Sequence, residues 1–200
     1  MFSRVLDRPR VYRLWQAPFA ERKLAPVLAG NDISRVRRVL DVGCGPGTNT
    51  RHFRHADYYL GIDVNPQYVE YARARYGRDF EVADITTYRV QPTQRFDFIL
   101  VNSLLHHLDT VAVRGLLARL ASLLTDDGHV HILDLVLPST RGLARLLATL
   151  DRGDYARPLS DWNALFRQSF QPVAVEPYQL QAFGVALWNM VYLKGRARSP

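Results

Sequence analysis

Short β-branched and apolar runs alternate along the chain with windows in which apolar residues recur at helical spacing. The run 96–101 is apolar at five of its six positions, which is typical of a strand covered on both faces. The other strand-like runs before residue 137 are 39–42, 58–62, 80–82 and 130–136. This alternation of strands and helices predicts an α/β fold whose open sheet is parallel through its central strands.

Several helix boundaries are marked by capping residues. Asn65 followed by Pro66 is typical of a helix start, and Gly77 is typical of its end. A stripe of leucines predicts a second helix, which begins after Thr110 and stops at Asp127-Gly128. Further helical windows cover 48–55, 143–150 and 162–166.

The two ends of the chain lie outside this alternation. Two strand-like runs, 172–175 and 186–193, close the sequence. Residues 1–30 contain three prolines, so we expect short helical pieces that lie on the sheet domain. A chain of 200 residues is enough for one domain and thin for two, so we expect a single domain over 1–200.

Composition and charge narrow the class of protein. Apolar residues make up 48% and charged residues 22%, which excludes a disordered or fibrous chain. The single cysteine, Cys44, excludes an intramolecular disulfide and a cysteine-cluster zinc site. No apolar run has the length of a signal peptide or a membrane span, so we expect a cytoplasmic protein. The net charge of +7 comes mainly from residues 1–40, where nine basic residues face three acidic ones.

A glycine-rich loop, 43–47, follows the first predicted strand. Its glycines alternate as Gly43, Gly45 and Gly47, which lets the backbone turn sharply and approach a ligand. The spacing fits neither a dinucleotide-binding fingerprint nor a phosphate-binding P-loop. Asp41, Asp63 and Asp84 stand at the carboxyl ends of successive strands, and they favour a cationic nucleoside over NAD or ATP.

Four segments in order resemble the class I S-adenosylmethionine-dependent methyltransferases. They are Leu-Asp-Val-Gly-Cys-Gly-Pro-Gly-Thr at 40–48, Gly-Ile-Asp at 61–63, Ala-Asp-Ile at 83–85 and Phe-Asp-Phe-Ile-Leu-Val-Asn-Ser-Leu-Leu-His-His-Leu-Asp at 96–109. The resemblance implies a Rossmann-like, doubly wound, seven-stranded, mostly parallel sheet in the order 3-2-1-4-5-7-6. Its strand 7 would be antiparallel, with helices on both faces.

The same resemblance implies S-adenosyl-L-methionine as cofactor and assigns roles to the motif residues. The glycines would approach its methionine part, Asp41 its amino end, Asp63 its ribose hydroxyls, Asp84 and Ile85 its adenine, and Asn102 the region of the sulfonium. The predicted cofactor-binding residues are Asp41, Gly43, Cys44, Gly45, Gly47, Asp63, Val64, Asp84, Ile85 and Asn102. Residues 35–137 would form the cofactor-binding core, 1–30 a helical lid, 138–170 an insert that covers the acceptor, and 171–195 the closing strands.

Methyl transfer to a hydroxyl gains from a base, and two histidines follow the fourth predicted strand. His106 or His107 is placed to take the proton, with Asp109 orienting the ring. The alternative is that the histidines only pack while Asp109 starts a helix. Oxygen is the first expectation for the acceptor atom, with nitrogen and carbon open. No metal site is predicted, since the pairs His52/His55 and His129/His131 lack a third ligand.

The acceptor is expected to be a small molecule in a lid-covered, largely aromatic pocket. Tyr12, Trp15, Tyr155 and Arg157 are the candidate acceptor residues, although aromatic side chains at helical spacing also serve as core. Arg157 would anchor an anionic acceptor or pair with a nearby aspartate.

Two other functions stay open. The basic N-terminal segment would serve an RNA or DNA methyltransferase, although no recognition domain accompanies it, so a nucleic-acid partner is not expected. A protein that binds the cofactor without catalysis is the other alternative. Either a monomer or a homodimer is compatible with the sequence.

Overall fold

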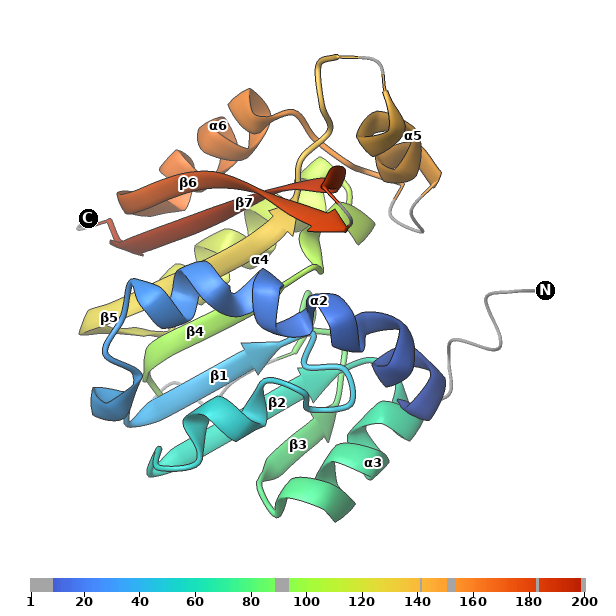
Figure 1. Cartoon of the computed structure of the whole chain (residues 1–200). Coiled ribbons are helices and arrows are strands. Elements are labelled where there is room, and N and C mark those ends of the chain that lie inside the picture. The colour runs from blue at the N-terminus through green and yellow to red at the C-terminus, as the bar shows by residue number, and fades with distance from the viewer. Residues whose placement is uncertain (1–8, 89–93, 141, 151–153, 183, 199–200) are drawn as a thin grey trace.

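The computed structural model describes residues 9–88, 94–140, 142–150, 154–182 and 184–198. Within these ranges seven strands form one sheet in the order β3-β2-β1-β4-β5-β7-β6 (Figure 1). The strands are β1 (Arg38–Val42), β2 (Tyr58–Asp63), β3 (Asp79–Val82), β4 (Phe96–Asn102), β5 (Leu124–Leu135), β6 (Phe170–Ala182) and β7 (Val185–Ala197). β1 to β5 pair in parallel, whereas β7 runs antiparallel to β5 and β6. The predicted fold class, strand order and direction of the seventh strand are confirmed.

Helices cover both faces of this sheet, as predicted (Figure 1). α2 (Pro9–Ala29) and α3 (Pro66–Tyr76) pack on one face, and α4 (Thr110–Ser122) and α6 (Leu159–Ser169) pack on the other. α5 (Leu143–Leu150) packs against β7 near the edge where the parallel strands end. The carboxyl ends of β1 to β5 therefore meet at an edge bordered by α2 and α5.

The buried core is divided by the sheet into two clusters. In β1, Leu40 and Val42 pack toward α4, whereas Val39 packs toward α2. This split follows from the alternation of side chains along a strand. Asp41 shares the side of Val39, so it lies beneath the glycine loop on the α2 side of the sheet.

The predicted start and end of α3 are confirmed. The Oδ1 atom of Asn65 accepts hydrogen bonds from the backbone N–H groups of Gln67 at 2.9 Å and Tyr68 at 3.4 Å. Gly77 ends the helix with φ of 59°, a left-handed conformation that glycine adopts without steric cost.

α4 ends earlier than its leucine stripe predicts. The helix stops at Ser122, and Leu124 already begins β5, where it pairs with Phe96 of β4. Asp127-Gly128 therefore lies within β5, in the stretch where the β4–β5 register shifts. Apolar periodicity alone does not separate the last turn of a buried helix from the first residues of a buried strand.

The N-terminal segment is one long helix rather than the predicted short pieces. Pro18 and Pro26 lie inside α2, although an interior proline costs about 3 kcal/mol. Packing offsets this cost, because Leu24 and Val27 are buried against the sheet. The Tyr178 hydroxyl also donates to a backbone carbonyl in the turn before Pro26, at 2.8 Å.

The helix between β1 and β2 is also shorter than predicted. The window 48–55 contains only a 3₁₀ helix, η2 (Thr50–Phe53), in place of an α-helix. Over the residues described, no helix combines the length and the apolar character that crossing a membrane requires.

Candidate active site

The glycine loop adopts a conformation that other residues rarely reach. Gly43, Gly45 and Gly47 have φ values of 68°, 54° and 75°. A Cβ atom at Gly47 would lie 3.0 Å from the Tyr76 ring of α3, and one at Gly43 would lie 3.2 Å from Leu104. The loop is thus held between α3 and the segment after β4, with its backbone free of side chains where a ligand would approach.

Asp63 links the loop to the end of β2. One of its carboxylate oxygens accepts from Gly45 N–H and the other from Asn65 N–H, both at 2.8 Å. Burial raises the pKa of Asp63, and the two amide hydrogen bonds oppose that rise. The next residue, Val64, is 65% exposed. An exposed apolar side chain beside a partly buried carboxylate is a surface that the ribose and base of a nucleoside would cover.

Asp41 lies under the loop rather than on its surface. Its side chain is 0% exposed and accepts the Tyr59 hydroxyl at 2.6 Å and the Asn49 amide at 3.3 Å. Burial raises its pKa to about 6. Tyr59 in turn accepts from the Thr50 hydroxyl at 3.0 Å. In this structure Asp41 contacts protein groups that fix the loop, in a network that the sequence alone did not reveal.

The other predicted cofactor residues lie around the same edge. Cys44 belongs to the glycine loop, and its side chain is buried. Burial raises the pKa of the thiol, which keeps the thiol protonated. Asp84 is exposed, and its Oδ1 accepts from the N–H of Thr86 at 2.9 Å. Ile85 is buried in the core. Asn102, at the end of β4, accepts at Oδ1 from the Ser103 hydroxyl at 3.1 Å.

Ser103 is a site residue that sequence reasoning missed. Among the described non-glycine residues it is the single one with a positive φ, 56°. The Nζ atom of Lys23, from α2, donates to its hydroxyl at 3.2 Å. The residue joins α2 to the end of β4, and its uncommon backbone conformation makes it a candidate site residue, since such conformations concentrate at active sites.

His106 is paired with Asp134 instead of the expected Asp109. The Nδ1 atom of His106 lies 2.6 Å from Oδ1 of Asp134, and both side chains are buried. The Asp134 carboxylate also accepts from the N–H groups of Leu105 at 2.8 Å and Leu135 at 2.7 Å. Asp109 instead caps α4 by accepting from Ala112 N–H at 2.8 Å, which is the alternative role recognised from the sequence.

The other predicted base, His107, lies beside His106. Their ring centroids are 4.2 Å apart. Both belong to the 3₁₀ helix η3 (Leu105–His107), directly after Leu104. The two imidazoles therefore differ in setting, because His106 is buried against Asp134 whereas His107 is exposed.

Arg157 holds the backbone of this segment instead of presenting its charge to an acceptor. Its guanidinium donates to the carbonyls of Leu108 at 2.7 Å, Tyr155 at 3.0 Å and Leu105 at 3.2 Å, and the residue is 6% exposed. Carbonyl contacts thus stand in place of the predicted pairing with a nearby aspartate, whereas the predicted contact with an anionic acceptor stays a prediction. The reason is burial, because a desolvated guanidinium needs acceptors around its fork of N–H groups.

Of the remaining predicted acceptor residues, the structure describes the side chain of Tyr155 alone. Tyr155 is 43% exposed, and its N–H donates to the carbonyl of His106 at 3.0 Å. Tyr12 and Trp15 belong to α2, and their side chains lie outside the described part of the chain. Trp162, also aromatic and in the predicted insert, is core: its indole N–H donates to the carbonyl of Leu135 at 2.9 Å.

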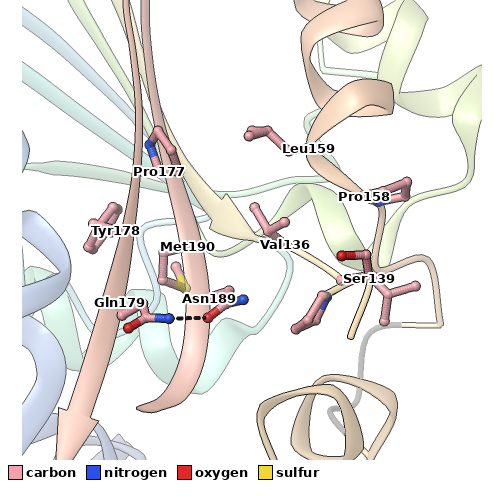
Figure 2. Close-up of a pocket in the computed structure, with 11 residues that line it drawn as sticks. Val136, Ser139, Pro158, Leu159, Pro177, Tyr178, Gln179, Asn189 and Met190 are labelled. Carbon is pink, nitrogen blue, oxygen red and sulfur yellow. Dashed lines mark hydrogen bonds between the residues drawn. The ribbon is translucent and has the colours of Figure 1, made fainter. Parts of the chain in front are cut away.

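A pocket of about 520 Å³ opens between the β6–β7 hairpin, the segment after β5 and the start of α6 (Figure 2). It is lined by Val136, Leu137, Pro138, Ser139, Pro158, Leu159, Pro177, Tyr178, Gln179, Asn189 and Met190. Of the lining residues that the structure describes, Tyr178 is aromatic and none belongs to α2. This lining is less aromatic than the sequence predicts, and cover of the acceptor by residues 1–30 stays a prediction.

The two histidine pairs have protein partners. His55 contacts the carbonyl of Ile33, and His129 accepts from Arg196 Nε at 3.0 Å. Within the described ranges, no three His, Cys, Asp or Glu side chains gather closely enough to hold a metal ion.

Comparisons with known proteins fit this geometry. A family model described as "Methyltransferase domain" matches residues 39–128. The chain is 34% identical over 147 residues to trans-aconitate 2-methyltransferase from Methylobacterium radiotolerans, covering 70% of this chain and 54% of that protein. It is 29% identical over 152 residues to O-methyltransferase cnsE from Penicillium expansum, covering 72% and 48%. The chain thus spans about half the length of these relatives.

A solved structure shares the fold over most of the chain. The N-methyltransferase NodS from Bradyrhizobium japonicum WM9, in complex with S-adenosyl-L-homocysteine, superimposes with a TM-score of 0.68 at 19% identity. The superposition covers 94% of this chain and 87% of that one.

Proposed function

Because this chain belongs to the class I S-adenosylmethionine-dependent methyltransferases, we propose that it methylates a hydroxyl oxygen of a small molecule, with His106 as the base. The observation that carries the proposal is the buried contact of 2.6 Å between His106 and Asp134, just beyond the end of β4. A histidine held at one ring nitrogen by a carboxylate is the arrangement that general bases use.

The edge of the sheet fits the cofactor. The cradle of three glycines with positive φ provides side-chain-free backbone, and Asp63 with the exposed Val64 provides a carboxylate and an apolar surface. Asp84 and Asn102 add polar side chains at the ends of β3 and β4. The buried Asp41 supports the loop by its hydrogen bond with Tyr59. When bound, S-adenosylmethionine supplies an electrophilic methyl group on a positively charged sulfur. The protein contributes alignment, worth about 7–11 kcal/mol in well-oriented reactions.

His106 takes the proton of the acceptor hydroxyl. An ionised carboxylate only accepts hydrogen bonds, so Asp134 keeps a proton on Nδ1 and leaves Nε2 as the basic nitrogen. The same carboxylate stabilises the imidazolium that forms. General-base assistance of this kind contributes about 10²–10⁴-fold to a rate. Arg157 fixes the segment that carries the histidine by holding the carbonyls on either side of it.

α2 serves as a fixed cover for this site. Lys23 reaches Ser103 next to Asn102, and the rings of Phe19 and Trp188 meet edge to face with centroids 5.1 Å apart. The Arg22 guanidinium also donates to the Gln181 carbonyl at 2.8 Å. These contacts anchor the second half of the helix to β6, β7 and the residue after β4. We expect removal of residues 1–30 to abolish turnover, because Lys23 contacts Ser103 beside the proposed cofactor residue Asn102.

The proposal of a small-molecule acceptor is supported by the relative whose name specifies one, trans-aconitate 2-methyltransferase. The expectation of an anionic acceptor depended on Arg157, whose donors are engaged with backbone carbonyls. The proposed function therefore includes no negative charge on the acceptor.

The test is transfer of a labelled methyl group from S-adenosylmethionine to a panel of hydroxylated and aminated small molecules, followed by NMR assignment of each product. We expect O-methyl ethers. Exclusive formation of N- or C-methyl products, or no transfer to any panel member by protein that binds S-adenosylhomocysteine, would contradict the proposal.

A further inference from the structure

Among the described residues, none of the side chains that line the pocket beside the β6–β7 hairpin is charged. The polar side chains of this lining are the hydroxyls of Ser139 and Tyr178 and the amides of Gln179 and Asn189. Three prolines from three separate segments belong to the lining, and Figure 2 labels two of them, Pro158 and Pro177. Because proline has a fixed φ and little side-chain freedom, these walls bind a ligand with a small entropic cost.

The two amides form an oriented pair. The Gln179 Nε2 atom donates to Asn189 Oδ1 at 3.2 Å across the β6–β7 ladder (Figure 2). Asn189 is further fixed by its backbone, because its carbonyl accepts from Val136 N–H at 2.8 Å. A neutral donor and acceptor pair held in this way recognises a neutral polar group better than an ion, whose desolvation it does not offset.

The pocket also adjoins the proposed base. Val136 follows β5 two residues after Asp134, the partner of His106, so the two side chains lie on the same side of the strand. Leu137 N–H donates to the carbonyl of Arg157 at 2.8 Å, and Arg157 holds the segment that carries His106. One wall of the pocket is thus continuous with the support of the base.

The register of the sheet gives the separation between the pocket and the end of β4. Asn102 pairs with Leu133, and Val136 lies three residues further. At about 3.3 Å per residue, the pocket begins about 10 Å beyond the site where β4 ends. A volume of about 520 Å³ is within the range of small-molecule sites.

We propose that this pocket binds the body of the methyl acceptor, and that the acceptor is an uncharged small molecule with its reacting hydroxyl toward His106. This inference rests on the proposed function and adds the location and charge class of the substrate. The proposed acceptor differs from trans-aconitate, the molecule in the name of several relatives, because trans-aconitate is a tricarboxylic acid. Within the part of the chain that the structure describes, the lining holds no cationic side chain that would offset the lost hydration of a polycarboxylate.

A matched pair of probes tests the proposal on the full chain saturated with S-adenosylhomocysteine. The probes are 4-phenylphenol and 4′-hydroxybiphenyl-4-carboxylate, which differ by one carboxylate, and trans-aconitate is the third ligand. Calorimetry is expected to give an affinity for 4-phenylphenol at least about tenfold higher than for either anion. Gln179→Lys places a cation in the pocket and is expected to raise the affinity for the biphenyl carboxylate about tenfold.

The control is Gln171→Lys, which makes the same change in charge at an exposed position of the same strand, away from the pocket. It should leave all three affinities unchanged. Stronger binding of an anion than of 4-phenylphenol to the unaltered chain would overturn the inference, as would equal effects of the two lysine substitutions or no binding of 4-phenylphenol. Binding of S-adenosylhomocysteine distinguishes failure of this inference from failure of the proposed function. If the unaltered chain did not bind S-adenosylhomocysteine, the proposed function itself would be contradicted.

Discussion

His106 and Asp134 are joined across 28 residues of sequence by a contact of 2.6 Å between Nδ1 and a carboxylate oxygen. The carboxylate is fully buried and also accepts two backbone N–H groups, one from the histidine segment and one from β5. These bonds fix its orientation independently of the imidazole. Asp134 is therefore a positioning residue for the base, and its removal should affect the rate more than cofactor affinity.

Replacing Asp134 by Asn tests this role. An amide can donate a hydrogen bond to Nδ1, which would move the ring proton to Nε2 and remove the basic nitrogen from the acceptor side. We expect kcat to fall about 10²-fold or more, with the affinity for S-adenosylhomocysteine within about twofold of the original. Steady-state kinetics and calorimetry measure the two quantities. A kcat within twofold of the original would show that the carboxylate does not act through His106.

Replacing Arg157 by Met should destabilise the fold. Three backbone carbonyls lose a charged donor, and hydrogen bonds to charged groups contribute about 1.5–3 kcal/mol each. We expect the free energy of unfolding to fall by about 2–4 kcal/mol in urea titrations. The exposed Arg114 of α4, changed to Met, is the control and should alter stability by less than about 0.5 kcal/mol. Equal stability of the two variants would contradict the clamp described for Arg157.

Two glycine substitutions should have opposite effects. Gly47→Ala places a Cβ atom 3.0 Å from the Tyr76 ring at a φ of 75°, so it should weaken binding of S-adenosylhomocysteine and lower stability. Gly115→Ala lies in α4 with open space around the new Cβ, and it should raise the free energy of unfolding by about 0.5–1 kcal/mol. Thermal unfolding with and without the ligand measures both. Stabilisation by Gly47→Ala would mean that the loop tolerates a side chain.

Asp41 should make stability depend on pH in an unusual direction. Its folded pKa is raised from the ordinary 3.8 to about 6, so the native state binds its proton more tightly than the unfolded state does. Its contribution is therefore present below about pH 4 and is lost as pH rises through 6, a change of about 3 kcal/mol. The difference in unfolding free energy between the original chain and Asp41→Asn, followed from pH 4 to 7, measures this term. A flat difference would contradict the shifted pKa.

Local motifs allowed much of the fold and the cofactor edge to be predicted. The loop at 43–47 and the carboxylate of Asp63 are each specified by a few adjacent residues at the end of a strand, and the structure joins them through the Gly45 N–H. Strand order followed from the family resemblance. Confirmation of the α3 caps shows that such short-range chemistry is readable directly from sequence.

Long-range partners were not predictable in the same way. Asp109 is near the histidines in sequence, but Asp134 reaches His106 because β5 lies beside β4. The available signal was a lone acidic residue in the apolar run 130–136, since a buried charge requires a partner. Arg157 bonds to a carbonyl 52 residues away, and α2 stays helical through two prolines because tertiary packing outweighs local propensity.

The most direct test of the central claim compares His106→Gln with the original chain, using labelled S-adenosylmethionine and an acceptor from the panel, across pH 5 to 9. We expect kcat to fall about 10²–10⁴-fold and to lose its dependence on the ionisation of the base, while S-adenosylhomocysteine binds with unchanged affinity. Retention of the original kcat and pH profile by His106→Gln would contradict the assignment of this histidine as the base for methyl transfer.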